Sequence, residues 1–205
     1  MAGRVLRLAV LFEGGLFALA LGLGWLLGYP PLTGVDFGWE GLAGGVLATV
    51  APLVALWWCA WTRWAPLRRL MREVERVVAI FAGCSHFELA LISLLAGIGE
   101  ETLFRGVIQT ALADWLNPWG AWVVASGLFG LGHFITPAYA VVAVFFGLYL
   151  GALLLVSGNL LPPMIAHTLY DFFAMIYLLR RHRAITRLSE CSDFEDRITE
   201  VKRDR

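Results

Sequence analysis

Long apolar stretches, separated by short connections rich in polar residues, glycine or proline, follow one another along the 205-residue chain. About 20 apolar residues in a helix cross the hydrocarbon core of a bilayer, and six stretches reach or approach this length. The pattern therefore predicts an all-α fold, a polytopic transmembrane helical bundle of about six spans. The six stretches are Leu6–Leu27, Gly41–Trp61, Phe87–Leu112, Trp119–Phe134, Tyr139–Val156 and Leu160–Leu179.

The first apolar stretch begins like a signal peptide, because Arg4 and Arg7 precede it. However, the stretch is long, Glu13 interrupts it, and no small-residue cleavage site closes it convincingly. We interpret it as a retained membrane anchor. Glu13 either snorkels toward the interface or meets a partner that the sequence does not reveal.

A different pattern occupies residues 66–81, where arginines alternate with Leu70, Val74, Val77 and Val78. Such a segment is typical of an amphipathic helix that lies in the plane of the membrane surface. Tryptophans are enriched at that interface, and several precede the segment. They are Trp57, Trp58, Trp61 and Trp64.

Charged residues are distributed unevenly among the connections. Arginines crowd the connection after the second stretch and follow the last one, whereas Asp36 and Glu40 lie between the first two stretches without a basic residue. The positive-inside rule then places both termini and the arginine-rich connection in the cytoplasm. We expect one membrane-embedded domain at residues 1–188, with its motif core at about 87–180, and a charged, loosely attached cytoplasmic tail at 189–205.

Composition supports a membrane environment. Hydrophobic residues make up 59% of the chain and charged residues 16%, whereas soluble domains carry about 25% charged residues. The net charge is zero, which gives a nucleic acid no electrostatic attraction. The expected partner is therefore the lipid bilayer and not a nucleic acid.

Three ionisable residues, Glu100, Glu101 and Arg105, interrupt the third apolar stretch in the segment GIGEETLFRG. A charged side chain at such depth costs about 2.5–3.5 kcal/mol on insertion scales. Glu101 and Arg105 are four residues apart, the favourable order for an ion pair on one helix face, and Glu100 lies about 100° around the helix. A buried ion network that joins two spans is the structural interpretation; a reactive carboxylate at Glu100 is the functional one.

Two further clusters favour the functional interpretation. Phe129 and His133 are four residues apart near the end of the fourth stretch, and His167 and Asp171 are four apart within the sixth. Small residues around His133 would allow helix backbones to approach closely.

These three clusters together resemble the motifs of the CPBP intramembrane proteases, which include the type II CAAX prenyl endopeptidases and bacteriocin-processing or immunity proteins. The segment EETLFRG is similar to the first motif, and the resemblance covers residues 96–174. The last motif position, often asparagine in that family, is Asp171 here. The resemblance implies an endopeptidase of membrane-associated peptide or protein substrates, located in a bacterial inner membrane.

Carried over by position, the resemblance makes Glu100 the general base that activates water, with His133 sharing or orienting that water. His167 and Asp171 would stabilise the oxyanion, and Asp171 must then be protonated or orient His167. Glu101, Arg105 and Phe129 would support the site.

A metal is a separate question. Glu100, His133 and His167 are ligand types that suit a catalytic zinc ion, but they would have to come from three different spans. We expect zinc not to be obligatory. If the spans ran straight, His133 would lie near the inner boundary and His167 nearer the outer one, so convergence requires tilted or broken helices.

Two other classes of function fit the pattern. A catalytically idle scaffold, such as a bacteriocin-immunity protein, would keep the fold without needing Glu100. A small ion-coupled transporter would also place acids and histidines at mid-membrane, but the chain is short and lacks inverted repeats. The sequence indicates neither whether the substrate is prenylated nor the oligomeric state.

Overall fold

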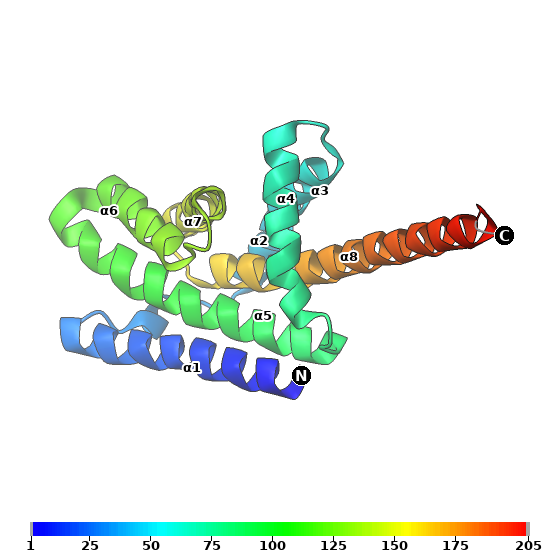
Figure 1. Cartoon of the computed structure of the whole chain (residues 1–205). Coiled ribbons are helices and arrows are strands. Elements are labelled where there is room, and N and C mark those ends of the chain that lie inside the picture. Colours follow the sequence, from blue (N-terminus) through cyan, green and yellow to red (C-terminus); the bar gives the residue numbers. More distant parts are fainter. Residues whose placement is uncertain (1, 204–205) are drawn as a thin grey trace.

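The computed structural model describes residues 2–203, and it describes side chains for residues 3–184. Every regular element in the described residues is helical, which confirms the all-α prediction (Figure 1). The α-helices are α1 (Ala2–Leu27), α2 (Trp39–Ala48), α3 (Val50–Trp61), α4 (Ala65–Val78), α5 (His86–Glu101), α6 (Thr110–Gly132), α7 (Pro137–Ser157) and α8 (Leu161–Arg203). Two short 3-10 helices, η1 (Pro31–Gly34) and η2 (Ala79–Phe81), and one π-helix, η3 (Thr102–Gln109), complete the chain.

All six predicted apolar stretches lie almost entirely in helices. Three helical segments are long and apolar enough to cross a membrane by themselves, and a bent pair of helices would make a fourth. The three are Gly3–Leu27, Trp39–Trp61 and Pro137–Ser157, and the bent pair is Ala65–Phe81 with His86–Gly132. The number of six spans stays a prediction, because the remaining helices carry the polar residues of the motifs and are less hydrophobic.

The outer surface of the bundle is strongly apolar. Large side chains such as Leu11, Trp25, Phe145 and Val156 are 66–88% exposed, an arrangement that suits contact with lipid. The buried polar and charged residues, by contrast, gather around α5, η3 and α8. The fold is therefore apolar outside and polar at its centre.

The chain reverses at Asn117, which divides α6 into two antiparallel arms. Asn117 has φ 63° and ψ 165°, and Pro118 follows it. The Asn117 side chain accepts hydrogen bonds from the backbone N–H groups of Trp119 and Gly120, both at 3.1 Å, and so caps the second arm. The outward arm from Glu101 and the returning arm to His133 have nearly equal length, so His133 comes back to the depth of Glu101.

Helix α7 is steeply inclined to its neighbours. It is viewed almost end-on in Figure 1, whereas α1, α5 and α8 run across the page with α1 beside α5. The break at Asn117 returns the chain toward Glu101 and so contributes to the convergence that straight spans would prevent.

The predicted amphipathic segment 66–81 forms α4 and η2. Leu70, Met71 and Glu75 are buried, whereas the arginines of α4 are exposed. The predicted division into a domain at 1–188 and a tail at 189–205 stays a prediction; the backbone of α8 continues to Arg203, and the side chains of the predicted tail lie outside the described residues.

Candidate active site

The π-helix η3 brings two polar side chains onto α7. Arg105 Nη2 donates to the carbonyl of Gly147 at 2.9 Å, and Gln109 Nε2 donates to that of Gly151 at 3.3 Å. A Cβ atom at Gly147 would lie 3.3 Å from Arg105, and one at Gly151 would lie 2.7 Å from Gln109. The absence of a side chain at both positions therefore permits the close contact. The sequence signal for this interface is the small-x-x-x-small pattern of α7, which the motif analysis missed.

Glu101 is the centre of a buried network between α5, η3 and α8. Its Oε1 atom accepts hydrogen bonds from Arg105 Nη1 and from His167 Nδ1, both at 2.8 Å. The Arg105 guanidinium also lies 4.4 Å from the ring centroid of Phe129. Glu101, Arg105 and Phe129 are each at most 1% exposed, so the ion pair is shielded from water. The predicted pairing of Glu101 with Arg105 is confirmed.

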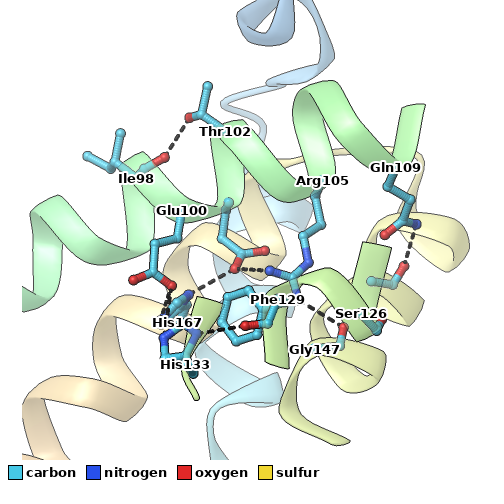
Figure 2. A network of polar contacts seen from close by, with 12 residues as sticks. Ile98, Glu100, Thr102, Arg105, Gln109, Ser126, Phe129, His133, Gly147 and His167 are labelled. Atoms are coloured by element: carbon cyan, nitrogen blue, oxygen red, sulfur yellow. Dashed lines mark hydrogen bonds and ion pairs between the residues drawn. The ribbon is translucent and has the colours of Figure 1, made fainter. Parts of the chain in front are cut away.

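Glu100 points into a different set of contacts (Figure 2). Its Oε2 atom lies 3.5 Å from His133 Nε2 and 4.0 Å from His167 Nε2. This oxygen is buried and has no hydrogen-bond partner among the described residues. Glu100 is thus free of the Arg105 ion pair, as its position on the helix predicted, and it faces both imidazoles.

The hydrogen bonds of the two imidazoles fix their tautomers. His133 Nδ1 lies 2.9 Å from the carbonyl oxygen of Phe129, which can only accept, so Nδ1 carries a hydrogen. His167 Nδ1 donates in the same way to the Glu101 carboxylate. In each histidine, Nε2 is therefore the atom directed at Glu100. It has a free lone pair when the ring is neutral and an N–H group when the ring is protonated.

Asp171 and His133 form the more open side of the site. Asp171 Oδ2 lies 3.4 Å from His167 Nε2, and its side chain is 31% exposed. The His133 side chain is 27% exposed, whereas those of Glu100 and His167 are 8% and 4% exposed. A substrate would consequently approach Glu100 past His133 and Asp171.

Aromatic rings hold the two imidazoles in place. Phe129 stacks on His133 with ring centroids 4.4 Å apart, and it meets His167 edge-on at 6.0 Å. Phe146 of α7 packs edge-on against the other side of His167 at 5.3 Å. Phe129, predicted only as structural support, therefore positions both histidines as well as Arg105.

Glu13 lies beside the site, which the sequence did not indicate. The Glu13 backbone carbonyl would lie 2.8 Å from a Cβ atom at Gly99, so α1 packs directly on α5 at that point. The Glu13 Oε2 atom is buried and has no hydrogen-bond partner among the described residues.

The structure brings together every predicted site residue: Glu100, Glu101, Arg105, Phe129, His133, His167 and Asp171. The candidate zinc ligands Glu100, His133 and His167 do meet. However, within the described residues no group of three or more His, Cys, Asp or Glu side chains is arranged to hold a metal ion.

The fold and the site together define a helical membrane protein with a buried carboxylate–imidazole cluster. The family model described as "Type II CAAX prenyl endopeptidase Rce1-like" matches residues 82–173. This match covers less than half of the chain and confirms, for residues 82–173, the predicted resemblance to the CPBP proteases. Comparisons with curated proteins and with solved structures gave no match. The apolar helices and the similarity to a family of membrane proteases indicate an integral membrane protein and support a CAAX-type protease kind of function.

We expect substitutions in the Glu101–Arg105 pair to affect folding more than chemistry. Arg105→Ala leaves a buried carboxylate without its cation, and Glu101→Gln leaves a buried guanidinium without its anion, at a cost of about 3–5 kcal/mol. Either change should lower the yield of folded protein and the thermal unfolding temperature of the purified protein. Glu40→Gln, which removes an exposed carboxylate, should leave both unchanged. Wild-type yield and stability of Arg105→Ala would contradict this role.

Proposed function

We propose that the protein is an intramembrane endopeptidase in which Glu100 activates water for attack on a peptide bond of a membrane-associated substrate. The observation that carries the proposal is the position of Glu100 Oε2 opposite two imidazole Nε2 atoms, buried and without a hydrogen-bond partner among the described residues. The Glu100–His133 distance of 3.5 Å is long for a direct hydrogen bond, so both groups can turn toward a water molecule that enters beside them.

In the proposed reaction, Glu100 removes a proton from that water as its oxygen attacks the carbonyl carbon of the scissile bond. Neutral His133 accepts the second water hydrogen through its Nε2 lone pair and so orients the nucleophile. The carbonyl oxygen becomes an oxyanion. Collapse of the tetrahedral intermediate breaks the C–N bond, and the proton held by Glu100 passes to the leaving amine, which closes the proton balance.

The oxyanion is stabilised by a hydrogen bond from His167, and the tautomer of His167 decides when this histidine can donate. Because Nδ1–H donates to Glu101, His167 can donate from Nε2 only when the imidazole is protonated. The carboxylates of Glu101 and Asp171 stabilise such an imidazolium from both sides. Asp171 then acts by orienting and neutralising His167, and it does not need to donate a hydrogen bond itself.

We expect Glu100→Gln to abolish peptide hydrolysis and to leave the fold intact. Glutamine keeps the size of the side chain but cannot accept the proton, and loss of a general base costs about 10²–10⁴-fold in rate. The measurement is cleavage of membrane-anchored peptides, with and without a prenyl group, by purified protein in lipid nanodiscs. Glu40→Gln serves as the control, since it removes one exposed carboxylate outside the site. Near wild-type cleavage by Glu100→Gln would overturn the assignment.

The mechanism proposed here needs no metal ion. We expect the purified protein to contain well under one equivalent of zinc and to keep its activity after gentle chelation. His133→Ala should impair cleavage without any change in metal content, whereas a zinc ligand would lose metal and activity together. The test is metal analysis beside the cleavage assay, before and after a chelator, with zinc added back. Stoichiometric zinc whose removal and return switch activity off and on would make Glu100, His133 and His167 ligands.

The proposed setting is a bacterial inner membrane with both termini in the cytoplasm. The exposed arginines of α4 and the acidic connection that holds Asp36 and Glu40 support this orientation through the positive-inside rule. Reporter fusions in bacterial cells should give a cytoplasmic signal near Arg69 and Arg187 and an external signal near Asp36. An external signal at Arg69 would reverse the proposed orientation.

A further inference from the structure

A cavity lies where α3, α4 and α8 meet, and it shares no residue with the carboxylate–imidazole site. Its volume is about 210 Å³, several times the roughly 30 Å³ that one molecule occupies in liquid water. The cavity is lined by Cys59, Ala60, Arg68, Met71, Arg72, Glu75 and Arg181. It is the mixture of apolar and basic residues in this wall that indicates a ligand.

The only acid in the cavity wall is already neutralised. Glu75 Oε1 lies 2.6 Å from Arg181 Nε, and Arg181 Nη1 also donates to the carbonyl of Ala60 at 2.6 Å. Arg68 and Arg72 take part in no ion pair within the described part of the chain, and both are exposed. The cavity therefore presents two uncompensated guanidinium groups.

The arginines of α4 are of two kinds. Arg68 and Arg72 lie on the helix face that also carries Met71 and Glu75, since these positions follow a spacing of three and four residues, and this face lines the cavity. Arg69 and Arg76 are exposed but do not line it. The same helix thus provides a pair of arginines directed at the cavity and a pair outside it.

The cavity lies at the level expected for lipid headgroups. Helix α3 ends at Trp61, and α4 begins at Ala65 as a strongly amphipathic helix. Tryptophans of the kind that mark the membrane interface surround this junction: Trp57, Trp58, Trp61 and Trp64 are 55–70% exposed. A ligand here would meet the arginines with its polar end and Cys59, Ala60 and Met71 with its apolar end.

We propose that this cavity binds the phosphate group of an anionic phospholipid headgroup. Guanidinium groups bind phosphate through paired N–H donors, and the apolar wall accommodates the beginning of the acyl chains. A zwitterionic lipid carries a cation that two free arginines repel, so the cavity favours a lipid with net negative charge. A bound lipid would fix the position of α4 against α3 and α8.

The test compares two double variants with the same change in net charge. Full-length protein in detergent is mixed with dioleoyl phosphatidylglycerol or with dioleoyl phosphatidylcholine, and bound lipid is measured by native mass spectrometry. Wild-type protein should bind phosphatidylglycerol in preference to phosphatidylcholine. Arg68→Gln/Arg72→Gln should weaken that binding about 30-fold, the equivalent of about 1 kcal/mol for each arginine. Arg69→Gln/Arg76→Gln should change it less than about threefold, since these arginines lie outside the cavity.

A second measurement uses the thiol in the cavity wall. In a Cys84→Ser/Cys191→Ser background, phosphatidylglycerol should slow the reaction of Cys59 with a maleimide, and inorganic phosphate should not. Equal weakening by the two double variants would show diffuse attraction to the basic helix and overturn the proposal. Equal binding of the two lipids would overturn it as well. Protection of Cys59 by inorganic phosphate alone would show a site for the free anion instead of a lipid.

Discussion

The buried ion pair between Glu101 and Arg105 is the interaction on which the rest of the structure depends. Two charges in an apolar bundle are tolerated only when their hydrogen-bonding groups find partners. Arg105 reaches Glu101, the Gly147 carbonyl and the Phe129 ring, while Glu101 also accepts from His167. These partners come from α5, α6, α7 and α8. Satisfying one ion pair thus ties four helices together and places Phe129 and His167 where the chemistry needs them.

The same pair makes two adjacent carboxylates chemically different. The Oε1 atom of Glu101 has two close donors, so its electron pairs are occupied and its charge is balanced by Arg105. Glu100, one residue earlier, is turned about 100° around the helix and has only the two imidazole Nε2 atoms before it. Glu101 Oε2 also lacks a hydrogen-bond partner among the described residues, but Arg105 balances the charge of that carboxylate, whereas the free oxygen of Glu100 faces the two imidazoles. The structural network and the proposed reactive group are therefore complementary parts of one arrangement.

Much of this arrangement could be predicted from the sequence because it is local. The apolar stretches predicted the helices, and the four-residue spacing of Glu101 and Arg105 predicted their pairing, which requires no knowledge of other helices. The convergence of His133 and His167 could not be predicted in this way, since it depends on the break at Asn117 and on packing between helices that are distant in sequence. Asn117-Pro118 is a visible signal for a break in the helix. That the break returns His133 to the depth of Glu101 follows only from the nearly equal lengths of the two arms.

Glu13 and the α7 glycines were missed for another reason. Their roles depend on contacts between helices that are distant in sequence. Glu13 packs against Gly99, Gly147 against Arg105, and Gly151 against Gln109. A close contact of this kind leaves only a small residue in the sequence, and glycine is common throughout this chain. The pattern Gly147-x-x-x-Gly151 predicts a close packing face on the helix, but it does not indicate which helix packs there.

The helices divide between those that suit lipid and those that carry the polar residues. The segments Gly3–Leu27, Trp39–Trp61 and Pro137–Ser157 are apolar enough to cross a membrane, and only 17–28% of their most apolar windows is buried. The ionisable groups of the site come instead from α5, η3, the end of α6 and α8. Helix α7 shows how the two groups join: it has no charged side chain, and it supplies backbone carbonyls to Arg105 and Gln109 and a ring to His167. Because a carbonyl satisfies a donor without adding charge, an apolar helix can complete a polar site and still present an apolar face to the bilayer.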